Sequence, residues 1–153
     1  MNDLERKKFI KHLENDDELQ IIIRTHLYIE SQFASFLKRA LINHKVLNLN
    51  KMSYHNKLNL CVALGLFDEA HSSSYREYNT LRNKIAHNLD YKVSQKDLIS
   101  VKKAAAEWEG LSGVVNEFKL IDGNNSLIND LKVLSASLFV FLRGLVEERK
   151  RDY

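Results

Sequence analysis

Proline is absent from this chain of 153 residues, and glycine occurs only 5 times. Both residues punctuate strands and tight turns, so their scarcity disfavours an all-β sandwich or barrel and favours long helices. Hydrophobic residues make up 44% of the chain and charged residues 28%, which is enough to build one compact core. We therefore expect one all-α domain that spans residues 1–153.

Apolar residues recur at helical spacing in six segments, which predicts an up-and-down bundle of five to six helices. Ser53, Ser94 and one of the serines at 72–74 are the expected N-caps, whereas Gly65 and Gly110 are expected to end helices. A turn is expected at residues 122–125. The predicted helices are Leu4 to Leu13, Glu18 to about His44, Ser53 to Leu64, Tyr75 to about Asn88, Gln95 to Glu109, and Leu127 to Glu148.

The second predicted helix places Glu30 at the centre of its apolar side. Burial of an unpaired carboxylate is costly, so we expect a structural buried acid with a cationic partner. Arg82 is the first candidate partner, followed by Arg76 and Lys57. His26 lies one turn before Glu30, a spacing that also suits two metal ligands, but no third ligand has a convincing spacing. The residues expected on the inner side are Leu19, Ile23, Leu27, Ala34, Leu37 and Leu41.

The formal net charge is only +3, so any role in nucleic-acid binding must depend on a local site. Cys61 is the only cysteine, which excludes an intramolecular disulfide and favours a buried thiol in a reducing compartment. The charged N-terminus does not resemble a signal peptide, and the apolar stretch from Val133 to Leu142 is too short to span a bilayer. We expect a cytoplasmic protein that does not contact membranes.

The fourth predicted helix carries an unusual polar side. Arg76, Asn79, Asn83 and His87 share this side at about 100° per residue, and Arg82 lies at its flank. A guanidinium can bind phosphate oxygens and stabilise charge in a transition state, and imidazole can exchange a proton near neutral pH. The sequence contains no glycine-rich phosphate loop, nucleophile elbow or zinc-protease helix.

The segments from Lys57 to Asp68 and from Leu81 to Asn88, together with Tyr78, resemble the HEPN superfamily of helical domains. Within that superfamily, the chain is most similar to the branch that includes the mannitol operon repressor family and related uncharacterised bacterial proteins. The resemblance extends from about Glu18 to Asn88. Arg82, Asn83 and His87 match the arginine, polar residue and histidine of the motif in HEPN ribonucleases.

This resemblance implies metal-independent cleavage of RNA, in which the ribose 2′-hydroxyl attacks the adjacent phosphate without a cofactor. His87 would be the acid or base, Arg82 would stabilise the phosphorane, and Asn83 would orient either group. A homodimer is expected because two facing copies would enclose one composite cleft. A toxin or phage-defence component with an antitoxin or regulatory partner is the expected context. The residues expected to contact RNA are Arg76, Asn79 and Lys84.

Two alternatives to catalysis remain open at this point. Relatives in the mannitol operon repressor branch suggest a non-catalytic regulatory or protein-interaction module. Pairing of Arg82 with Glu30 would likewise give the motif a structural role, because the guanidinium would then hold two helices together.

Overall fold

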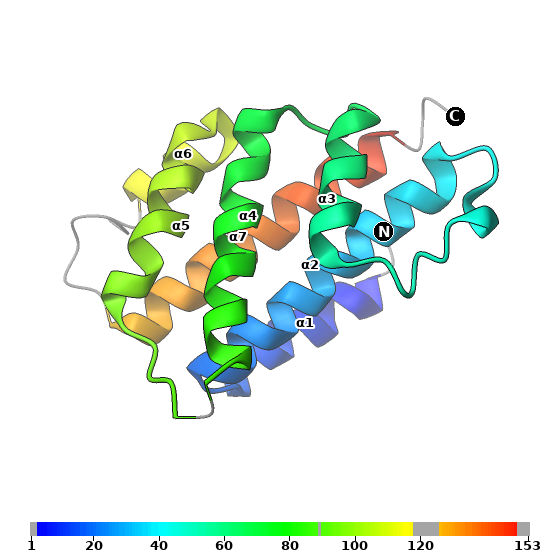
Figure 1. Cartoon of the computed structure of the whole chain (residues 1–153). Coiled ribbons are helices and arrows are strands. Elements are labelled where there is room, and N and C mark those ends of the chain that lie inside the picture. Colours follow the sequence, from blue (N-terminus) through cyan, green and yellow to red (C-terminus); the bar gives the residue numbers. More distant parts are fainter. Residues whose placement is uncertain (1–2, 89, 118–125, 150–153) are drawn as a thin grey trace.

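A computed structural model describes residues 3–88, 90–117 and 126–149. Within these ranges the chain forms helices and turns but no strand, which confirms the predicted all-α bundle (Figure 1). The described residues form seven α-helices rather than five to six, and the turn expected at residues 122–125 lies outside them. The elements are α1 (Asp3–Asn15), α2 (Glu18–Ala40), a 3-10 helix η1 (His44–Val46), α3 (Tyr54–Ala63), α4 (Glu69–Ala86), α5 (Gln95–Glu107), α6 (Glu109–Glu117) and α7 (Leu127–Glu148).

The helix that the sequence pattern missed is α6. Trp108 has extended backbone angles, φ −87° and ψ 118°, and ends α5, after which a new helix begins at Glu109. Gly110 therefore does not end a helix but lies near the start of one. Leu111 and Val115 are both buried, one helical turn apart, and they anchor α6 to the core. Two glycines in this short segment weaken the helical pattern, which is why it was not predicted.

Helix α4 begins earlier than its serines suggest. Asp68 is the N-cap, and its side chain accepts a hydrogen bond of 2.8 Å from the backbone N–H of His71. Ser72 lies within the helix, where its hydroxyl donates to the carbonyl of Glu69 at 2.7 Å. The helix ends at Ala86, slightly before the predicted end at Asn88, and His87 is its C-cap.

Three of the local signals at helix ends are confirmed. The Ser53 side chain accepts from the Asn56 backbone N–H at 3.2 Å, and Ser94 forms a capping box with Asp97. Gly65 follows α3 with a φ of 76°, in the left-handed region that favours glycine.

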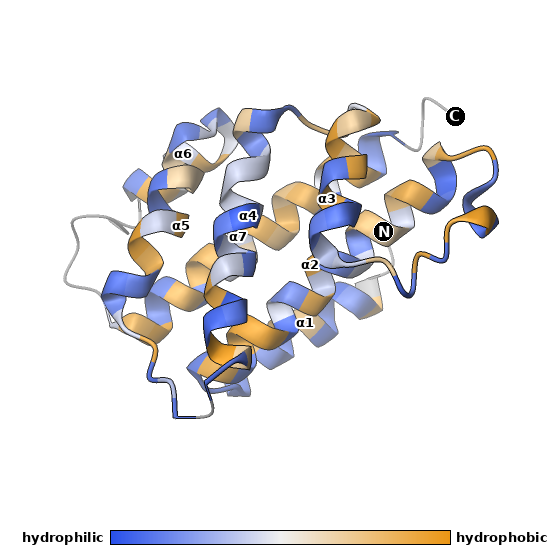
Figure 2. Ribbon diagram, viewed as in Figure 1, coloured by the Kyte–Doolittle hydropathy of each residue, from blue (hydrophilic) through white to orange (hydrophobic). Residues whose placement is uncertain are grey.

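The helices pack around α2 and α7. In Figure 1, α3, α4 and α5 stand side by side, with α4 running opposite to its neighbours and crossing in front of α7. Two buried tyrosines of α4 fasten this crossing: Tyr75 donates to the carbonyl of Leu138 at 3.0 Å, and the hydroxyls of Tyr78 and Ser135 lie 2.9 Å apart. Figure 2 shows polar and hydrophobic residues on different sides of most helices, as expected for an amphipathic bundle.

The predicted inner face of α2 is wrong in part. Ile23 and Leu27 are 40% and 56% exposed, whereas Ile22, Ile29 and Phe33 are fully buried. The first half of α2 carries apolar residues around most of its circumference, so more than one face fits a helical period. The large rings of Phe33 and Phe36 bury more apolar surface than the predicted alternatives and fix the observed face. The buried residues of α2 are Ile21, Ile22, Thr25, His26, Ile29, Gln32, Phe33, Phe36 and Leu37.

None of the helices in residues 3–88, 90–117 and 126–149 has the length and apolar character required to cross a membrane.

Candidate functional site

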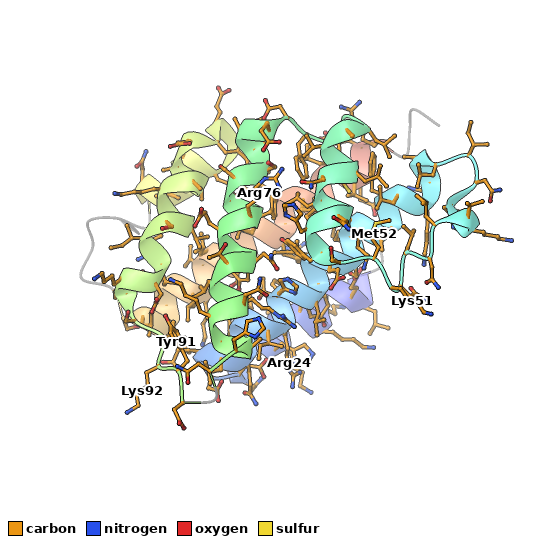
Figure 3. All side chains as sticks on the ribbon, in the orientation of Figure 1. Arg24, Lys51, Met52, Arg76, Tyr91 and Lys92 are labelled. Atoms are coloured by element: carbon orange, nitrogen blue, oxygen red, sulfur yellow. The ribbon has the colours of Figure 1, made fainter. Side chains whose placement is uncertain are left out.

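The first part of the polar side of α4 ties α4 to its neighbours. Arg76 extends toward α3 (Figure 3), where its Nη1 donates to Oδ1 of Asn59 at 2.7 Å. Its Nη2 lies 3.0 Å from Oε1 of Glu69, and its Nε donates to the hydroxyl of Ser72 at 3.3 Å. These bonds link Arg76 to α3 and to the first turns of its own helix. Because His87 lies three turns further along α4, Arg76 lies about 16 Å from it along the helix axis.

Asn79 links α4 to α2 through a buried histidine. Its Oδ1 lies 2.9 Å from Nε2 of His26, so the imidazole donates there and is protonated on Nε2. His26 is 4% exposed, and its ring stacks on that of Tyr54 at 4.2 Å. Burial lowers the pKa of His26, against the opposing effect of the Asn79 hydrogen bond, and the charge of Arg82 lowers this pKa further. His26 is therefore a neutral structural residue at physiological pH.

Glu30 pairs with Lys57 and not with Arg82. Nζ of Lys57 lies 2.6 Å from Oε1 of Glu30, and the two side chains keep 6% and 23% of their surface exposed. The expectation that Arg82 would be the partner is wrong, because Glu30 faces α3, where Lys57 follows Tyr54 by one turn. Glu30 is only partly buried, since the inner face of α2 is not the predicted one. The pair lines an open groove of about 630 Å³, which Arg82 and His87 do not line.

The spacing of His26 and Glu30 also suits two metal ligands, but in the structure each side chain has another partner. His26 bonds to Asn79 and Glu30 bonds to Lys57. Among the described residues, no three His, Cys, Asp or Glu side chains are grouped so that they could hold a metal ion.

Arg82 and Asn83 lie near the end of α4, and His87 is its C-cap. Arg82 is half-buried, and its Nη1 donates to Oδ1 of Asn83 at 3.3 Å. No carboxylate in the described part of the chain pairs with Arg82. His87 is exposed at the C-cap, where its backbone N–H donates to the carbonyl of Asn83 at 3.1 Å. The structure thus brings Arg82 and Asn83 into contact and leaves His87 accessible to solvent one turn beyond Asn83.

Lys84 lies apart from these residues. Its Nζ is 3.7 Å from Oδ1 of Asp97, the residue that completes the capping box of α5. Tyr91 donates a very short hydrogen bond to the same carboxylate. Burial alone would raise the pKa of Asp97, but the hydrogen bonds from Tyr91 and Ser94 outweigh this effect and lower that pKa. Lys84 is therefore directed toward α5, whereas Asn79 is directed toward α2.

Two other residues have the structural roles that the sequence favours. Cys61 is fully buried, and this burial raises the pKa of its thiol far above the usual range. Trp108 is 7% exposed and packs against the rings of His71, Tyr75 and Phe141. A thiolate nucleophile at Cys61 and base stacking at Trp108 both require access that these side chains do not have.

Comparison with known proteins identifies no relative. No family model matches the chain, and no curated protein or solved structure matches it either. The resemblance to HEPN domains therefore rests only on the segments from Lys57 to Asp68 and from Leu81 to Asn88, together with Tyr78.

Proposed function

We propose that this chain is a metal-independent endoribonuclease of the HEPN type, with Arg82, Asn83 and His87 as its catalytic residues. The observation that carries the proposal is the partner of Glu30. Lys57 neutralises that carboxylate at 2.6 Å, so the guanidinium of Arg82 is not consumed in a pair with it. The only hydrogen-bond partner of Arg82 among the described residues is the neutral amide of Asn83. An arginine with this environment remains available for a phosphate.

In the proposed reaction, the 2′-hydroxyl of a ribose attacks the adjacent phosphorus atom while the imidazole of His87 accepts its proton. The bond from phosphorus to the 5′ oxygen then breaks, and the departing oxygen takes up a proton from water. The products are a 2′,3′-cyclic phosphate and a 5′-hydroxyl end. Arg82 stabilises the charge on the equatorial oxygens of the phosphorane, and Asn83 orients the guanidinium through the observed hydrogen bond.

The position of His87 favours a site that is shared with a second molecule. Arg82 and His87 are separated by five residues and so by about 7.5 Å along the axis of α4. In a single chain, Arg82 and His87 are too far apart along the helix to face one phosphate closely. In a homodimer, each site could be completed by one of these side chains from the other copy. We propose that the protein acts on RNA in the cytoplasm, as a toxin or phage-defence component controlled by an antitoxin or other regulatory protein.

The test is RNA cleavage by the purified protein in EDTA. We expect cleavage by the wild type, with 2′,3′-cyclic phosphate ends, and a loss of about 100-fold or more in Arg82→Ala and in His87→Ala. His55→Ala and Arg6→Ala are matched controls, because both side chains are exposed on other helices. Absence of cleavage of any RNA by the folded wild type would overturn the proposal, as would equal loss in the control variants.

A non-catalytic interaction module is the second candidate. Arg76 and Asn79 favour it, because both use their side chains to hold α4 against α3 and α2. Under this alternative, the last turn of α4 continues the same structural role and Arg82→Ala lowers stability without any activity to lose. The EDTA assay and a melting curve of the same variant separate the two candidates.

A further inference from the structure

The segment between α2 and α3 exposes apolar side chains at its outer end. Ile42 is fully exposed, Val46 on η1 is 77% exposed, and Leu47 is 37% exposed. In Figure 1 this segment projects beyond the helices at the right of the molecule, and Figure 2 shows hydrophobic residues on its outermost turn. We refer to residues 41–53 as the η1 loop. Apolar side chains gathered on a projecting surface are typical of a site that contacts another molecule or a membrane.

Other apolar residues hold the η1 loop to the bundle. Leu49 is buried, and Leu41 and Met52 are partly buried against the core. Backbone hydrogen bonds of 3.0–3.3 Å within the loop give it a defined course. The loop is therefore anchored without Ile42 and Val46, and the exposure of these two side chains needs a separate explanation.

The sequence contains no acidic residue between Glu30 and Asp68. This stretch comprises the C-terminal half of α2, the η1 loop and all of α3, and it carries five basic residues. Because the whole chain has a formal net charge of only +3, the remaining residues together carry −2. The positive charge of the molecule is therefore concentrated in and beside the η1 loop. The five basic residues are Lys38, Arg39, Lys45, Lys51 and Lys57.

Three of these cations are available to an external anion. Lys57 and Arg39 already have partners within the chain. Lys38, Lys45 and Lys51 are exposed, and none of them has an ion pair or hydrogen bond with the part of the chain that the structure describes. Lys38 and the residue before Lys51 line the same open groove of about 630 Å³, so the loop passes beside the end of α2. Figure 3 shows Lys51 at the outer edge of the loop.

We propose that the η1 loop binds the surface of an anionic lipid bilayer, with Ile42 and Val46 inserted below the headgroups and the three lysines on lipid phosphates. Long lysine side chains reach the phosphates while aliphatic neighbours enter the hydrocarbon boundary, and stable binding needs both signals. RNA would satisfy the lysines but would leave Ile42 and Val46 in water. A protein partner would need a hollow that matches the projecting loop, whereas fluid hydrocarbon needs no complementary shape. The sequence-based expectation of no membrane contact considered only a signal peptide and a spanning stretch, neither of which concerns this loop.

The η1 loop lies away from the proposed ribonuclease site. Asn79 of α4 meets α2 at His26, about 20 Å along the helix axis from the end of α2 at Ala40. From that point α4 continues away from the loop (Figure 1), so a bilayer at the loop leaves Arg82 and His87 accessible. Membrane binding and RNA cleavage can therefore fail separately, because the first is read from vesicles and the second from RNA ends.

Co-sedimentation with vesicles tests the binding. We expect the full chain to sediment with vesicles of equal parts phosphatidylcholine and phosphatidylglycerol, and to stay in solution with vesicles of phosphatidylcholine alone. Lys45→Ala should weaken binding about five-fold, and Ile42→Ser about ten-fold. Lys96→Ala and Ile99→Ser are the matched controls, because both side chains are exposed on α5, and they should bind like the wild type. Circular dichroism should show the same helix content in all four variants, since none of these side chains is buried.

A fluorescent label tests the insertion. Native Cys61 is fully buried, so an environment-sensitive dye on Ile42→Cys reports on the η1 loop alone. Its emission should shift to the blue on the anionic vesicles, whereas the same dye on Ile99→Cys should not change. The proposal is overturned by a wild type that stays in solution with the anionic vesicles, by equal weakening in the loop and control variants, or by sedimentation without a blue shift at Ile42→Cys. Capture of RNA or of an acidic protein by the loop, without binding to vesicles, would also overturn it.

Discussion

Replacement of Arg82 and of Lys57 should have opposite consequences for stability and activity. Arg82→Ala removes a half-buried guanidinium whose hydrogen bond to Asn83 is long, at 3.3 Å. A net hydrogen bond contributes about 0.5–1.5 kcal/mol, and arginine and alanine are both good helix formers, so we expect a loss of less than about 1 kcal/mol. The same variant should cleave RNA about 100-fold or more slowly, because the charge on the phosphorane would have no other guanidinium at this position.

Lys57→Met keeps the buried aliphatic stem and removes only the ammonium group. Breaking a fully buried ion pair costs about 3–5 kcal/mol, but Glu30 keeps 23% of its side chain exposed, so water can solvate part of its charge. We therefore expect a loss of about 1–3 kcal/mol, which Glu30→Gln in the same chain should largely recover. The variant should retain cleavage once it is folded.

Urea unfolding followed by circular dichroism measures both free energies of unfolding, and Glu30→Gln alone serves as the third corner of the cycle. A loss of more than about 2 kcal/mol in Arg82→Ala, equal to or larger than that in Lys57→Met, would refute the reasoning. It would show that Arg82 holds the helices together, and the ribonuclease proposal would lose its main support.

Three further predictions concern the helices around the site. Nζ of Lys102 lies 2.5 Å from Oδ2 of Asp130, and the two side chains are only 6% and 1% exposed. Asp130→Asn should therefore lower the free energy of unfolding, measured in urea, by about 3 kcal/mol, and the second change Lys102→Met should recover most of this loss. Gly65→Ala should lower the free energy of unfolding by about 1 kcal/mol, because the φ of this residue is +76°. Gly113→Ala should raise it by about 0.5–1 kcal/mol, because a Cβ at this position on α6 meets no other atom within 4 Å. Melting temperatures of the two variants should shift in opposite directions. Burial holds the pKa of His26 below its usual value, so on acidification the unfolded chain binds a proton before the folded chain does. The stability of the fold should therefore be constant above about pH 6.5 and fall as the pH drops below that value. In melting curves between about pH 7.5 and 5.5, His26→Gln should reduce this dependence on pH.

The helix ends were predictable because their signals are local. Ser53, Ser94 and Gly65 act on groups within one turn of themselves, so no knowledge of the tertiary structure is needed. Asp68 is also a local cap, but three serines in a row gave a competing signal four residues later. The boundary of α4 therefore depended on which of two equally suitable caps the apolar packing selected.

The inner face of α2 and the partner of Glu30 could not be predicted in the same way. Ile21, Ile22 and Ile23 are consecutive, so the helix has an apolar residue in three directions and only its neighbours decide which becomes exposed. The partner of Glu30 was mispredicted for the same reason. The face of α2 that is actually buried directs Glu30 toward α3, where Lys57 and not Arg82 lies. One error in the helical face thus produced the error in the ion pair.

The polar side of α4 is divided between two roles along its length. Its first half, with Arg76 and Asn79, is used to fasten α4 to α3 and α2, which accounts for an arginine and an amide there without any ligand. The last turn contains Arg82 and Asn83 bonded to each other, and His87 exposed beyond them, with none of these side chains fastening two described helices together. A uniform stripe could have been explained by helix packing alone. Because packing accounts for only its first half, the need for another explanation is confined to these three residues, which are the ones that we propose as catalytic.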